Sequence, residues 1–221
     1  MSSTSAVVNQ SLRKRVAPLL RKAGFQRVDA RNGWCWQEKV ILVFNIRAVG
    51  SYFAGVTGWP PGSVGVWLGG FYAFGPASSS VKLDKVGRLL PAEYQCHMRS
   101  HLECGLDQSQ RVRSLSNPAE RERRDIWWLE PDGSNAEDVA SDIGLSFLKG
   151  GVPWFEHVTN LEAALALVEG ERDCFTKFVR AAFLARELGD IERWQKYDSL
   201  AEVEAKRIGR TLDRNSWHVA V

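Results

Sequence analysis

The chain has 221 residues, enough for one large domain or for a medium domain with an appendage. Its 44% hydrophobic and 25% charged residues are typical of a globular protein with a core, and no apolar run is long enough to cross a bilayer. The net charge of +3 is well short of that of a strongly basic domain, which weighs against nucleic-acid binding without excluding it.

The charges are segregated along the chain. Residues 1–28 contain six basic residues and no acid, whereas residues 129–171 contain nine acids against Lys149 alone. Patches of this kind can steer a charged partner, and they can equally face one another or solvate two helices.

A helix is predicted at the N-terminus, because Val8, Leu12, Val16 and Leu19 recur at helical spacing. Pro18 should kink or restart this helix. The pattern then changes to strands, and Asn32-Gly33 predicts a two-residue hairpin turn.

Two long strands are expected next. In residues 40–48, "VILVFNIRA", both the odd and the even positions are apolar as far as Phe44. This is typical of a central strand that is covered on both faces. Residues 63–74, "SVGVWLGGFYAF", predict another strand with glycines at points of close approach, and residues 124–130, "RDIWWLE", predict a further one.

The stretch "CHMRSHLEC", from Cys96 to Cys104, alternates between apolar and polar residues and therefore predicts a half-buried strand. On such a strand His97, Arg99 and His101 share the polar face, opposite Cys96, Met98 and Leu102. That polar face is the candidate binding surface, since arginine is favoured at binding hot spots and binds carboxylates through two nitrogens.

Helical periodicity returns after Ser134. Ser134 with Glu137 and Thr159 with Glu162 fit capping boxes, and Gly150-Gly151 should end the first of these helices before residues 152–158 cross back. Two further helices should end at Gly189 and begin at Asp190.

This order of elements predicts an α+β fold, with an antiparallel sheet of about five or six strands packed with an N-terminal helix and C-terminal helices. We expect an α+β domain over residues 1–169, a helical hairpin extension over 170–210, which could form a separate lobe, and a loosely held tail over 211–221.

The order of these landmarks resembles that of the bacterial domain-of-unknown-function 4304 family over roughly residues 12–168. The matching positions would be Leu20, Gly24 and Phe25, then Trp127, and finally Pro153, Trp154 and Glu156. The resemblance implies an α+β domain and brings with it no nucleophile, base or metal ligand.

A metal site in "CHMRSHLEC" depends on its secondary structure. On a strand, His97 and His101 would be about 13 Å apart, too far to share one ion. On a helix the same four-residue spacing would place both histidines on one face, where they could chelate a metal together with Cys104. The alternation favours the strand, so no metal and no other cofactor is expected.

Catalytic motifs give little support for an enzyme. Cys35, Cys96 or Cys174 could pair with a histidine, but Cys35 and Cys174 look like small core residues. The sequence contains no Gly-x-Ser-x-Gly elbow, phosphate-cradling glycine loop or His-Glu-x-x-His motif.

The sequence predicts a non-catalytic binding or accessory module, of which immunity proteins are one type, that recognises another protein. The alternative is an enzyme of unidentified class acting through His97, Arg99 and His101. The N-terminal residues lack the order of a signal peptide, which predicts a cytoplasmic location with reduced thiols and no membrane partner. The sequence leaves the oligomeric state open.

Overall fold

The computed structural model describes residues 4–76 and 80–212. The chain forms two compact units. Unit 1 contains residues 1–36, 42–69 and 99–153, and unit 2 contains residues 37–41, 70–98 and 154–221.

The N-terminal segment forms two helices, α1 (Thr4–Arg15) and α2 (Ala17–Lys22). Pro18 occupies the first turn of α2, where a missing N–H does no harm, so the predicted restart at this residue is confirmed. Gly24 follows with a φ of 91°, a conformation that favours glycine. Helix α1 packs against α6 (Ala136–Ser146) within unit 1.

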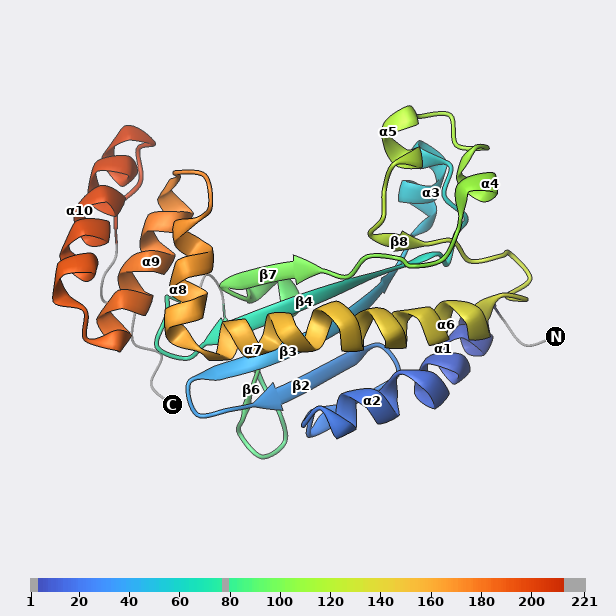
Figure 1. Ribbon diagram of the computed structural model, residues 1–221, viewed down its shortest axis with the longest axis horizontal. Coiled ribbons are helices and arrows are strands. Elements are labelled where there is room, and N and C mark those ends of the chain that lie inside the picture. The colour runs from blue at the N-terminus through green and yellow to red at the C-terminus, as the bar shows by residue number, and fades with distance from the viewer. Residues whose placement is uncertain (1–3, 77–79, 213–221) are drawn as a thin grey trace. The chain divides into compact units, whose positions relative to one another are not determined.

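The fold is α+β, as predicted (Figure 1). Its six-stranded sheet has the order β1-β2-β3-β4-β7, and β8 pairs with β4 beyond this path. The strands are β1 (Arg27–Val28), β2 (Asn32–Trp36), β3 (Val40–Ala48), β4 (Val64–Tyr72), β7 (Met98–His101) and β8 (Ile126–Trp127). A separate two-stranded sheet in unit 2 joins β5 (Lys82–Leu83) to β6 (Leu89–Leu90).

The hairpin prediction was wrong about its turn. Arg27 pairs with Trp34 and Val28 with Gly33, so the chain turns before Asn32. The Asp29 carboxylate forms this turn by accepting the backbone N–H groups of Arg31 and Asn32 at 2.8 and 2.7 Å. Gly33 lies inside β2, where an added Cβ would come within 2.9 Å of the Phe25 ring.

Three short helices lie at one end of unit 1: α3 (Ser51–Thr57), α4 (Ser109–Val112) and α5 (Pro118–Arg121) (Figure 1). Val112 of α4 belongs to a small apolar cluster with Trp59, Leu115 and Ile126, and Phe53 of α3 packs against this cluster. A further short element, the 3-10 turn η1 (Glu93–Gln95), precedes β7 in the chain.

The predicted ends of the C-terminal helices need correction. Helix α6 is followed without a loop by a π-helical turn, η2 (Phe147–Gly151), and by α7 (Val152–Thr159), so Gly150-Gly151 do not end the helix. An added Cβ on Gly151 would lie 2.8 Å from the Phe147 ring, so this glycine makes room for packing.

Neither capping box forms, because each helix begins one residue later than predicted. Asn135 is the N-cap of α6, and Asn160 is the N-cap of α8 (Leu161–Glu169), where its side chain accepts the Ala163 N–H. Glu137 instead accepts hydrogen bonds from Ser11 and Arg15 of α1.

Unit 2 contains α8, α9 (Phe175–Leu188) and α10 (Ile191–Arg207), and α9 packs against both of the others. Gly189 ends α9 in the left-handed conformation, and the Asp190 side chain caps α10, as predicted. The division of the chain at residues 169 and 210 stays a prediction, and most of the predicted tail, residues 213–221, lies outside the described residues. Among the residues described, no helix is long and apolar enough to span a membrane.

Candidate binding face of the sheet

One face of the sheet in unit 1 is packed by helices. Phe147 of η2 contacts Phe44 of β3, with ring centroids 5.6 Å apart, and Phe25, with centroids 6.2 Å apart. Because side chains alternate along a strand, the residues on either side of Phe44 point away from these helices.

The opposite face carries arginine and tryptophan, and we call it the Arg–Trp face. It consists of Arg27, Asn32, Trp34, Trp36, Val43, Asn45, Arg47, Trp67, Arg99 and His101. Arg27, Arg47, Arg99 and His101 are exposed, the tryptophans and asparagines are partly exposed, and Val43 is buried.

Contacts between these side chains place them on one face of the sheet. Arg27 lies over the Trp34 ring and Arg47 over the Trp67 ring, each 5.3 Å from the centroid. Leu102 N–H donates to Val66 O at 3.0 Å, so alternation along the antiparallel pair puts His101 opposite Trp67. Arg99, two residues before His101, shares its side of β7.

Arg47 is held in place by a series of side-chain hydrogen bonds. Asn32 donates to Asp29, Asn45 Nδ2 donates to Asn32 Oδ1 at 2.6 Å, and Arg47 Nε donates to Asn45 Oδ1 at 2.9 Å. The guanidinium is thereby oriented above the Trp67 ring before any ligand arrives.

Gly65 lets the Trp67 ring lie along the sheet. An added Cβ on Gly65 would fall 2.3 Å from the nearest ring atom of Trp67. The indole therefore covers the position where another residue would project its side chain. The result is a flat aromatic surface with a cation above it.

His97 does not share the environment of Arg99 and His101. It precedes β7, and its ring packs against Phe71 and Phe183 of unit 2, with centroids 4.9 and 5.1 Å away. The predicted strand is thus confirmed only for Met98–His101, and the polar face predicted for all three residues holds for Arg99 and His101 alone.

Both ring nitrogens of His97 are engaged. Tyr72 N–H donates to Nδ1 at 3.0 Å, so the proton is on Nε2, which donates to Pro76 O at 2.9 Å. Burial lowers the pKa of His97 to about 4, opposed by the bond to Pro76 and assisted by the Arg180 charge. At neutral pH His97 therefore has no free nitrogen with which to act as a base.

The cysteines are also placed by the structure. Cys35, Cys96 and Cys104 are buried, and burial raises the pKa of the Cys104 thiol to about 12. Cys174 was predicted to be a core residue, and this was wrong. It is exposed at the N-cap of α9. Within residues 4–76 and 80–212, no three His, Cys, Asp or Glu side chains gather closely enough to hold a metal ion.

Of the residues on the Arg–Trp face, the sequence had indicated Arg99 and His101 as candidates but not Arg47, Trp34 or Trp67. Two features of the sequence could have indicated them. The odd-numbered positions of β3 change from apolar residues to Asn45 and Arg47, and a glycine stands two residues before Trp67. Strand pairing was needed to bring those positions together.

Comparison with known proteins gives no matching family model, no matching curated protein and no matching solved structure. The resemblance to the domain-of-unknown-function 4304 family therefore stays a prediction, and the function has to be argued from the geometry of the face.

Proposed function

We propose that this protein is a non-catalytic binding module, and that the Arg–Trp face recognises an acidic segment of another protein. The observation that carries the proposal is the pairing of exposed Arg47 with the flat Trp67 ring, beside Arg99 and His101 on the next strand. Arginine and tryptophan are the side chains most enriched at the energetic centres of protein interfaces.

The chemistry of the face favours binding over catalysis. Its ten side chains are cationic, aromatic, amide or aliphatic, and none of the ten is a thiol, hydroxyl or carboxylate. Arginine can bind a carboxylate through two parallel hydrogen bonds, which fix the orientation of the acid. An accessory or immunity-type role would require only such binding.

The alternative, an enzyme of unidentified class, would have to work through Arg99 and His101. His97 cannot serve as its base, because the Tyr72 N–H occupies Nδ1. This hypothesis and the binding hypothesis differ in whether a partner stays bound unchanged.

The test is capture of proteins from a lysate of the source cells by the immobilised full chain. The Arg47→Glu/Arg99→Glu variant removes two cations of the face, and Arg21→Glu/Lys22→Glu on the exposed surface of α2 is the matched charge control. We expect a protein retained by the wild type and the control but lost with the double variant.

The retained protein is then purified and its affinity measured by calorimetry at low and high salt. Direct binding that is weakened by salt and by the double variant supports the proposal. A retained protein that is insensitive to both arginines overturns it. Loss of retention after nuclease treatment would assign the face to nucleic acid, and turnover of the bound molecule would favour the enzyme.

A further inference from the structure

A hollow of about 330 Å³ opens in unit 1 beside α4. Its lining includes Arg121, Arg123 and Arg124 together with Gln108, Ser109 and Val112. Its volume is at the lower end of the range for small-ligand sites. No residue of the Arg–Trp face lines it.

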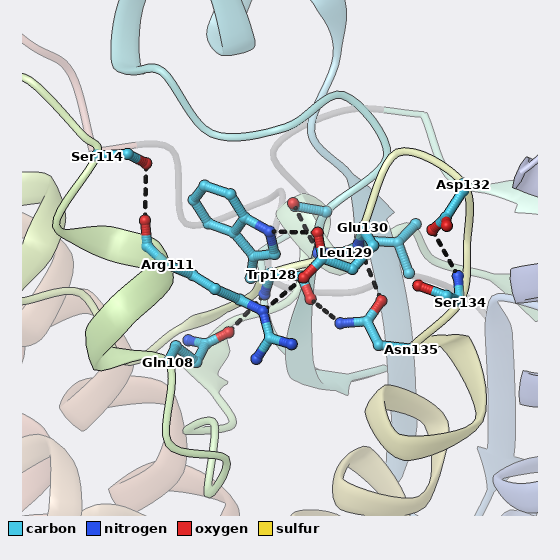
Figure 2. A network of polar contacts seen from close by, with 10 residues as sticks. Gln108, Arg111, Ser114, Trp128, Leu129, Glu130, Asp132, Ser134 and Asn135 are labelled. Carbon is cyan, nitrogen blue, oxygen red and sulfur yellow. Dashed lines mark hydrogen bonds and ion pairs between the residues drawn. The ribbon is translucent and has the colours of Figure 1, made fainter.

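The wall formed by α4 is fixed by a polar network (Figure 2). Gln108 is buried, its Nε2 donates to Ile126 O at 2.9 Å, and its Oε1 accepts the Trp128 N–H at 2.5 Å. Arg111 Nε donates to Glu130 at 2.6 Å, which joins α4 to the segment after β8. This wall therefore exists before any ligand binds.

Two of the three arginines are also held. Arg123 donates to both Asp125 oxygens, at 2.8 and 2.5 Å, and lies 5.5 Å from the centroid of the Phe53 ring. Arg121 donates through Nε to Leu115 O at 2.7 Å. Fixing these guanidiniums in advance reduces the entropy that a ligand would lose on binding.

The hollow contains acids as well as arginines, and the pKa of Asp107 is lowered first by its hydrogen bonds to Ser109 and further by the charges of Arg124 and Arg111. Of the lining carboxylates, Asp107 accepts the Ser109 N–H at 2.9 Å, and Glu122 is the other. Arg124 is exposed and makes no ion pair with any residue in the described part of the chain.

We propose that this hollow binds a phosphate monoester, with Arg124 as the principal contact and Arg121 beside it. A planar guanidinium matches two phosphoryl oxygens at once, and several arginines in one hollow suit a doubly charged group better than a single carboxylate. Val112 and Leu106 supply an apolar surface for the carbon part of the ester. The ester could be a free metabolite or a phosphorylated side chain.

The test is titration of the full-length protein with inorganic phosphate, phosphoserine, phenyl phosphate and glutamate, followed by calorimetry. We expect saturable binding of the two esters, weakened about tenfold or more by Arg124→Ala. Arg113→Ala is the matched control, because Arg113 is exposed in the same segment but does not line the hollow. Thermal unfolding of each variant shows that it remains folded.

A phosphoserine peptide separates the two sources of the ester. Binding about tenfold tighter than phosphoserine itself assigns the hollow to a phosphorylated partner, and equal affinity assigns it to a free ester. The proposal is overturned if the esters show no saturable binding, if glutamate binds equally well, or if Arg113→Ala weakens binding as much as Arg124→Ala. The Arg47→Glu/Arg99→Glu variant should bind phosphoserine normally, so the two proposals can fail independently.

Discussion

The two faces of the sheet in unit 1 both carry aromatic side chains but use them differently. On the helix-packed face, Phe44 and Phe147 meet edge to face at an interplanar angle of 84° and are almost fully buried. On the Arg–Trp face, guanidiniums lie over Trp34 and Trp67, and both rings stay partly exposed. What covers a ring therefore decides whether it stabilises the core or forms a surface that a ligand can reach.

The difference follows from the parity of β3. Its even positions from Val40 to Ile46 are all buried, whereas its odd positions change from buried Val43 to partly exposed Asn45 and exposed Arg47. Burial of apolar side chains packs one face against the helices. The amide and guanidinium groups on the other face need hydrogen-bond partners, which water or a bound protein can supply.

The largest effect should come from the helix-packed face. Phe147→Ala removes a ring that is 0% exposed and contacts two other rings, so unfolding should become easier by about 3–5 kcal/mol. Leu148→Ala, the neighbouring residue at 46% exposure, is the control and should change stability by less than about 0.5 kcal/mol. Urea unfolding measures both, and equal effects would contradict the packing described here.

The next largest effect concerns His97, which contrasts with exposed His101. Because the pKa of His97 is lowered to about 4 in the folded chain, the fold favours the neutral ring. Its contribution is therefore complete above the unfolded pKa of about 6.5 and is lost as the pH falls towards 4. The loss should approach about 3 kcal/mol, at roughly 1.4 kcal/mol per pKa unit.

The measurement is the free energy of unfolding at pH 7 and near pH 4, for the wild type and for His97→Asn. Asn can place an amide oxygen near the Nδ1 position and accept the Tyr72 N–H, but it does not titrate. The wild type should lose more stability than this variant over that range, and the variant of exposed His101, His101→Asn, serves as control. Parallel pH profiles for wild type and His97→Asn would refute the buried neutral ring.

A smaller effect tests the flat ring of the Arg–Trp face. Gly65→Ala places a methyl group 2.3 Å from the Trp67 ring, so the ring must move, at a cost of about 1–3 kcal/mol. In a Trp67→Ala background the same change should cost much less, and the double-mutant cycle measures the difference. Additive effects would show that the ring does not lie over Gly65.

The long elements of the fold could be predicted because their periodicity is local. Residues 40–48 form β3 as expected, and Gly189 and Asp190 separate α9 from α10 where cap chemistry indicates. Cap and turn positions failed where two residues competed. Asp29 makes the turn that was predicted at Asn32-Gly33, and Asn160 supplies the side-chain acceptor that was predicted at Thr159.

The candidate face could be predicted only in part. Arg99 and His101 follow from alternation along one strand, but Arg47 and Trp67 join them through pairing between strands far apart in sequence. His97 was misplaced for the same reason, since nothing local indicates that the Tyr72 N–H and the Phe183 ring, from β4 and α9, enclose it. The prediction that Gly150-Gly151 end a helix was wrong because, in the sequence, a glycine that makes room for a ring looks the same as a glycine that ends a helix.

The smallest effect on stability, and the sharpest distinction between the faces, is expected at Arg99. Its side chain is exposed at the edge of the Arg–Trp face, so Arg99→Ala should change the free energy of unfolding by less than about 0.5 kcal/mol. Arg47→Ala should cost more, because Arg47 stacks on Trp67 and bonds Asn45. Both variants should weaken retention of the captured partner. If Arg99→Ala instead costs more than about 1 kcal/mol, Arg99 forms a structural ion pair and does not belong to the binding face.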